Sequence, residues 1–148
     1  MKHYFFAEDF TVLKNEIERI GKKIKELGKE QGEAASQSTE NFGHDDACQE
    51  AIYDARRLLI SRINDLMRIY NKSEVANPSL QTEKIRLGSI VKLSDGRVFR
   101  IGSYMILANH NTRNISYGSP LAKSLLGKKK GDSIYFNGVI IEIESIDK

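Results

Sequence analysis

An acidic segment between Glu30 and Ala55 is the part of this sequence best suited to chemistry. It holds seven carboxylates and neither lysine nor arginine, although the whole chain carries a net charge of +3. The seven are Glu30, Glu33, Glu40, Asp45, Asp46, Glu50 and Asp54. Carboxylate oxygens are the ligands that Mg²⁺ prefers, so residues of this type can hold or share such an ion. Their position where two helical patterns meet predicts a projecting acidic tip.

Two long amphipathic helices are predicted beside this segment, near Glu8 to Ser36 and Asp45 to Lys72. In the first, apolar residues recur at the spacings of a heptad seam: Phe10, Leu13, Ile17, Ile20, Ile24 and Leu27. The second has a comparable seam of Cys48, Ile52, Ala55, Leu59, Ile63, Leu66 and Tyr70. Because each seam needs the other to cover it, we predict an antiparallel hairpin ~45 Å long, with its tip at about residues 37–46.

A β-rich domain is predicted after residue 76, because the helical pattern lapses and Pro78 disfavours helix there. The two domains are then residues 1–76 and 77–148. Strands are expected on both sides of two turn signals: Ile85–Leu93 with Arg97–Ala108, and Ser133–Phe136 with Val139–Ile146. Ser119 as N-cap, Pro120 at the first position and Gly127 at the end predict one short helix. The expected fold class is α+β, a helical hairpin followed by a sheet domain.

The amino-acid composition limits which classes of protein this chain can belong to. With 29% charged and 40% hydrophobic residues, the chain is expected to be a soluble, cytoplasmic monomer. The aromatic run Tyr4–Phe6 is too short for a signal peptide or a membrane span, so no membrane partner is expected. Cys48 is the only cysteine, which excludes an intramolecular disulfide and a cysteine-based metal site. We expect its side chain to be buried or half-buried on the second helix.

A series of short motifs in the C-terminal half carries a family resemblance. In chain order they are Gly88-Ser89, Ile115-Ser116, Ser119-Pro120-Leu121-Ala122, Leu125-Leu126-Gly127-Lys128 and Gly131-Asp132. They resemble the C-terminal domain of the bacterial Gre transcript-cleavage factors (GreA/GreB), and the pattern from Leu13 to Ile20 is similar to the start of that family's coiled coil. The resemblance implies an FKBP-like domain that docks on RNA polymerase through Ser119, Pro120 and Leu121. It also implies that the hairpin enters the secondary channel and reaches the nascent RNA 3′ end.

The same resemblance assigns a role to the tip. The family's motif reads Asp, Leu, x, Glu, Asn, Ala, Glu, Tyr, and without gaps it falls on residues 42–49, with the glutamate on Asp45 and the aspartate on Phe42. Asp45 is then the main carboxylate, and Asp46 or Glu40 replaces the ligand that Phe42 cannot supply. Such carboxylates would assist the polymerase active site through a shared Mg²⁺, with no tightly bound cofactor. The factor would stimulate cleavage of backtracked RNA without being an enzyme itself.

Other interpretations of these residues stay open. Asp45 and Asp46 are also favoured at a helix start by N-capping and the helix macrodipole. The altered tip is consistent with a channel-occupying regulator that inhibits polymerase without stimulating cleavage. A prolyl isomerase is a third alternative, because the implied fold is FKBP-like. Its site would need an aromatic pocket, whereas the available aromatics are expected to fill the core: Phe99, Tyr104, Tyr117, Tyr135 and Phe136.

Basic residues follow the acidic segment along the second helix. Arg56, Arg57 and Arg62 are candidate contacts for the phosphates of extruded RNA. Arginines on a coiled-coil surface are also commonly solvated or paired along the helix, and that alternative stays open. The lysine run from Lys128 to Lys130 is expected to be a solvated loop.

Overall fold

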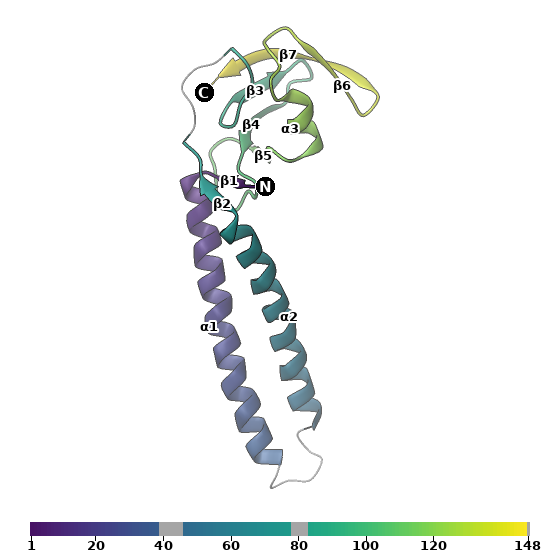
Figure 1. Ribbon diagram of the computed structural model, residues 1–148. Helices are drawn as coiled ribbons and strands as arrows, with labels where there is room; N and C mark the ends of the chain where they lie inside the picture. The colour runs from purple at the N-terminus through teal and green to yellow at the C-terminus, as the bar shows by residue number, and fades with distance from the viewer. Residues whose placement is uncertain (39–45, 78–82, 148) are drawn as a thin grey trace. The chain divides into compact units, whose positions relative to one another are not determined.

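The computed structural model describes residues 1–38, 46–77 and 83–147 of the chain, and the side chains of these residues except 31–38 and 46–47 (Figure 1). The chain forms two compact units. The helical unit is Leu13–Lys72, and the sheet unit combines Met1–Val12 with Ser73–Lys148. The predicted α+β class is confirmed. No helix in the described ranges has both the length and the apolar character that a membrane crossing requires.

The helical unit contains most of α1 (Ala7–Ser38) and all of α2 (Asp46–Asn71), which run side by side in opposite directions (Figure 1). Both helices begin and end within two residues of the predicted bounds. Ile20, Leu27 and Leu66 are buried as the seams predicted. Each such side chain stabilises the hairpin by roughly 1.5–3 kcal/mol.

Two glycines of α1 lie next to side chains of α2. A Cβ on Gly21 would lie 3.8 Å from the Ile63 side chain, and one on Gly28 would lie 3.4 Å from the Arg56 guanidinium. The two glycines are seven residues apart, and so are Ile63 and Arg56. The contacts therefore repeat with the heptad, in the register of an antiparallel pair.

The predicted seam of α2 is wrong at two positions. Ala55 is exposed, and the half-buried Arg56 takes the place next to α1 instead. The missing side chain of Gly28 gives the room that a guanidinium needs there. Cys48 is exposed rather than buried or half-buried.

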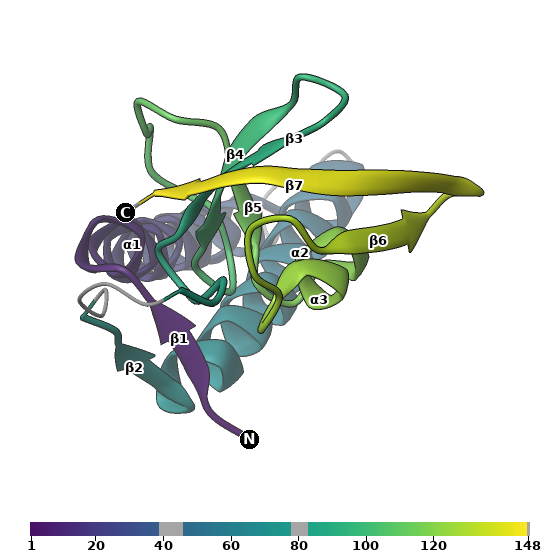
Figure 2. The same ribbon diagram turned by 90° about the horizontal axis from the view of Figure 1, so that it is seen from above.

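The sheet unit is built on a five-stranded mixed sheet of order β5-β4-β3-β7-β6 (Figure 2). Its strands are β3 (Ile90–Leu93), β4 (Val98–Gly102), β5 (Asn114–Ser116), β6 (Ser133–Phe136) and β7 (Val139–Asp147). Neighbouring strands are antiparallel except β4 and β5, which are parallel. Both predicted strand pairs are confirmed, although β3 and β4 are shorter than expected.

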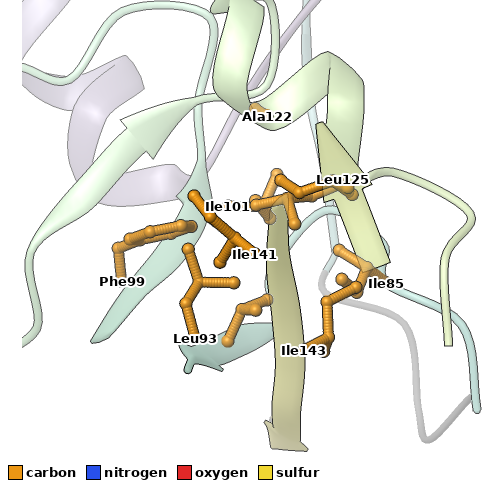
Figure 3. Close-up of a cluster of buried hydrophobic side chains, with 10 residues drawn as sticks. Ile85, Leu93, Phe99, Ile101, Ala122, Leu125, Ile141 and Ile143 are labelled. Carbon is orange, nitrogen blue, oxygen red and sulfur yellow. The ribbon is translucent and has the colours of Figure 1, made fainter. Parts of the chain in front are cut away.

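One short helix, α3 (Pro120–Leu125), packs against the sheet and completes its core (Figure 3). Ser119 is its N-cap, because the hydroxyl accepts a hydrogen bond from the Ala122 N–H at 3.3 Å. Gly127 follows the helix with a φ of 82°, a conformation that favours glycine. The predicted capping is confirmed. The buried core is Ile85, Val91, Leu93, Phe99, Ile101, Ala122, Leu125, Ile134, Ile141 and Ile143.

An expected core residue near the end of the sheet is exposed instead. Tyr135 on β6 is 73% exposed and Val139 on β7 is 58% exposed. Tyr135 pairs with the exposed Ile140 on the outer face of the sheet, opposite the face that carries the buried pair Ile134 and Ile141. The two strands continue past α3 as a hairpin (Figure 2).

The first residues of the chain belong to the sheet unit. Strand β1 (His3–Phe5) pairs in parallel with β2 (Ser73–Val75), and the Ala76 N–H donates to the Phe5 carbonyl at 2.7 Å. The compact units are thus drawn differently from the predicted division at residue 76. That residues 1–76 and residues 77–148 have separate functions stays a prediction.

Candidate functional site

The predicted tip lies largely outside the described residues. Glu40, Phe42 and Asp45 fall in the segment 39–45, which the described ranges do not include. Asp46 is the first residue of α2, so the positive end of that helix dipole lies within the acidic segment. In the described ranges no group of histidine, cysteine, aspartate and glutamate side chains is arranged to hold a metal ion. The metal-binding role of the tip therefore stays a prediction.

The three arginines proposed to meet RNA differ in their surroundings. Arg57 and Arg62 are exposed on α2. Arg62 also helps to lower the pKa of Glu16 on α1, although the hydrogen bond from Arg19 is the main cause. Arg56 lies against Gly28, and its Nε is buried without a hydrogen-bond partner. Arg57 and Arg62 are thus accessible to solvent, whereas Arg56 is half-buried, and the RNA-binding role of all three stays a prediction.

The turn before α3 holds the residues implied for polymerase binding. The Ser119 hydroxyl donates to the Ser116 carbonyl at 2.7 Å, and the Ser116 hydroxyl donates to the Tyr104 carbonyl at 2.8 Å. Leu121 is half-buried against the core. Pro120 is exposed, so it is the one member of the predicted trio whose side chain is free to contact a partner without holding the local fold. The turn thus presents Pro120 on a fixed backbone.

Sequence reasoning missed a buried polar cluster around Asp9, in the first turn of α1. The Asp9 side chain is fully buried, and its carboxylate receives four polar contacts from one segment after β4. These come from Ser103 Oγ at 2.6 Å, the Leu107 and Ala108 N–H groups at 2.8 Å each, and His110 Nε2 at 3.1 Å. The only sequence signal was a carboxylate placed one turn before the seam residue Leu13.

The charge of Asp9 is stabilised where it lies. Burial alone would raise the pKa of this carboxyl. The hydrogen bonds from Ala108, Ser103, Leu107 and His110 outweigh that effect, so the pKa of Asp9 lies below its ordinary value. The cluster is a structural anchor that attaches the first turn of α1 to the sheet unit.

Known proteins resemble this chain along most of its length. A family profile described as "Transcription elongation factor, GreA/GreB, C-term" matches residues 80–147. Transcription elongation factor GreA of Wolinella succinogenes is 35% identical over 127 residues, which cover 79% of this chain and 78% of the relative. The chain belongs to the GreA/GreB family.

A second GreA factor aligns over a shorter stretch. GreA of Helicobacter pylori strain Shi470 is 37% identical over 101 residues, so this chain spans 62% of that relative's length. Among solved structures, GreA factor homolog 1 (Gfh1) of Thermus thermophilus covers 100% of both chains at 22% identity, with a TM-score of 0.48. The family resemblance stated from the sequence is confirmed by the GreA relatives and the family profile.

Proposed function

We propose that this chain is a transcription elongation factor that binds RNA polymerase and stimulates cleavage of backtracked nascent RNA. In this proposal the sheet unit docks on the polymerase in the cytoplasm, the hairpin enters the secondary channel, and the polymerase carries out the cleavage. The observation that carries it is the 35% identity to a GreA factor over 79% of this chain.

The dimensions and charge of the hairpin support this role. At 1.5 Å per residue, the 32 residues of α1 extend over about 48 Å. The segment between the helices keeps the carboxylates Glu40 and Asp45, while the exposed arginines Arg57 and Arg62 follow on α2. This order matches a factor that brings carboxylates to a metal and cations to RNA phosphates.

Carboxylates at the tip have the chemistry that a shared Mg²⁺ requires. Mg²⁺ prefers oxygen ligands and is often held by one or two carboxylates plus water and phosphate. When bound, such an ion generates hydroxide and offsets the charge that develops on the phosphate. We assign Asp45 as the main ligand, with Asp46 or Glu40 as the second, so that this chain's residues bind and orient the ion.

A regulator that occupies the channel without stimulating cleavage is the second candidate function. The observation in its favour is Phe42, which stands where the family's motif has an aspartate and cannot hold a metal. The prolyl isomerase alternative has less support. Phe99 is buried in the core, and Tyr104 and Tyr117 are engaged by β1, with His3 stacked on Tyr104 at 3.9 Å and the Tyr4 N–H donating to the Tyr117 hydroxyl.

Replacing Pro120 by glutamate tests the docking assignment. We expect the affinity for RNA polymerase to fall by at least about tenfold, because a charge replaces an exposed apolar contact while Ser119 and Leu121 keep their structural roles. Binding of the full chain to polymerase core enzyme is measured by fluorescence anisotropy. The full chain is needed, because a fragment that starts at Gln81 would lose β1 and Asp9 from the sheet unit.

The matched control for this variant is Lys123→Glu. Lys123 is exposed on the same short helix, so its reversal changes the local charge without touching the proposed contact. We expect near wild-type affinity for Lys123→Glu. Equal affinities for wild type and Pro120→Glu would show that the turn before α3 is not the docking site.

A further inference from the structure

The outer edge of β6 is an open strand edge in the sheet unit. β6 is the last strand of the five-stranded sheet, and in the described ranges no segment pairs with its outer side. In an antiparallel pair, alternate residues direct their N–H and C=O groups away from the partner strand. β6 contains neither proline nor a charged residue, which are two of the features that commonly protect strand edges. At the opposite edge, β5 is half-buried along its whole length.

An exposed apolar pair lies directly beside this edge. Tyr135 on β6 and Ile140 on β7 are cross-strand partners on the outer face of the sheet, and they are 73% and 72% exposed. Val139, 58% exposed, adds to the same end of the hairpin. Aromatic and β-branched side chains that face each other in this way pack well against a residue of a third strand.

The next pair along the outer face carries an unpaired negative charge. Ser133 lies opposite Glu142, so the small serine separates this carboxylate from the open edge. Glu144, two residues further on β7, forms an ion pair with Lys92 at 3.7 Å. Within the described part of the chain Glu142 has no cationic partner. A lysine on an added strand would lie about 10 Å from the β7 backbone, two strand spacings away, which the two long side chains can bridge over Ser133.

We propose that the outer edge of β6 binds an extended peptide segment of another protein by strand addition. The peptide's backbone pairs with β6, an apolar side chain packs on Tyr135 and Ile140, and a lysine or arginine two residues away meets Glu142. Backbone pairing provides the affinity, and these two side-chain positions provide the specificity. This function is independent of the docking turn at Pro120.

The test uses the full chain and a fluorescein-labelled heptapeptide of sequence Thr-Val-Lys-Val-Val-Val-Thr. We expect saturable binding by fluorescence anisotropy, and slower amide hydrogen exchange in β6 when the peptide is present. A peptide with glutamate in place of lysine should bind about tenfold more weakly, because its charge faces Glu142. A peptide with proline in place of the central valine should not bind, because proline cannot donate to the strand ladder.

Variants of the protein test the apolar pair and the charge of Glu142 separately. Tyr135→Thr and Ile140→Thr should each weaken binding by at least about fivefold, and Glu142→Gln should remove the preference for lysine over glutamate. Val98→Thr is the matched control, because Val98 is an exposed apolar residue on the interior strand β4 and should leave binding unchanged. Pro120→Glu should also leave it unchanged.

Three results would overturn the proposal. The first is no saturable binding of the lysine peptide to wild-type protein that has native circular dichroism. The second is equal binding of the lysine, glutamate and proline peptides, which would indicate non-specific adhesion. The third is protection of the β6 amides that rises with protein concentration in the absence of peptide, because a second copy of the chain would then occupy the edge.

Discussion

Replacing Asp45 by asparagine is expected to reduce the stimulation of RNA cleavage by about 100-fold or more, while binding to polymerase stays near the wild-type value. The change removes a charged ligand from the shared Mg²⁺ site and leaves the apolar seam of the hairpin unchanged. Cleavage of the backtracked RNA 3′ end and binding to polymerase are measured on the same preparation. Glu50→Gln is the control, because Glu50 is an exposed carboxylate of the same acidic segment that the family motif does not assign to the metal.

Replacing Phe42 by aspartate should have the opposite effect. The variant restores the carboxylate of the family's motif, so cleavage should become faster, most clearly at low Mg²⁺ concentration, where the number of ligands limits occupancy. Unchanged cleavage rates in both Asp45→Asn and Phe42→Asp would contradict the metal-binding role of the tip.

Replacing Asp9 by asparagine is expected to lower the free energy of unfolding more than any other substitution named above. An amide has only one accepting oxygen, so it cannot accept all the hydrogen bonds that Ser103, Leu107 and Ala108 donate to the two carboxylate oxygens, and at least one donor is left unpaired. We expect a loss of about 3 kcal/mol in the free energy of unfolding, and a melting temperature lower by about 6–12 °C at 2–4 °C per kcal/mol. Differential scanning calorimetry measures both quantities. Glu8→Gln, at an exposed carboxylate of the same helix turn, should change the melting temperature little.

The contribution of Asp9 to the free energy of unfolding should decrease at low pH. Its pKa is lowered in the folded protein, so its stabilising effect is complete above the unfolded-state pKa of about 3.9 and is lost as the pH falls through the lower folded-state value. The difference in unfolding free energy between the wild-type protein and the Asp9→Asn variant should therefore be constant from about pH 7 to pH 5 and shrink below about pH 4. Urea unfolding measured in a His110→Gln background excludes the titration of the neighbouring imidazole. A difference that stays constant down to about pH 3 would contradict the assignment.

Local patterns predicted α1, α2, α3 and the strands β3, β4, β6 and β7, because spacing and turn signals within a short stretch of sequence mark them. The heptad spacing located α1 and α2, Ser119 and Gly127 located α3, and Asn137-Gly138 located the turn between β6 and β7. Strands β1, β2 and β5 were missed because each has three residues, and the pairing of β1 with β2 joins segments about seventy residues apart. No local signal marks such a pair.

The candidate site was predictable only in part. The tip at Asp45 lies outside the described residues and stays a prediction, whereas the family motifs located the turn at Ser119-Pro120. They did not show that Arg56 lies against Gly28, because the absence of a side chain on a different helix makes that room. The Asp9 cluster depends on contacts with residues about one hundred positions away, which residue spacing does not reveal. Tyr135 was expected in the core because its strand pattern does not show which face of the sheet α3 covers.

The central claim is that this chain stimulates RNA cleavage by polymerase, and one measurement tests it most directly. Purified protein is added to a backtracked elongation complex with Mg²⁺, and the length of the RNA labelled at its 5′ end is followed with time. The account predicts that the RNA becomes shorter from its 3′ end faster with the factor than without it, and that the shortened RNA can be extended again. Slower nucleotide addition with no shortening at any Mg²⁺ concentration would contradict the claim and favour the channel-occupying regulator.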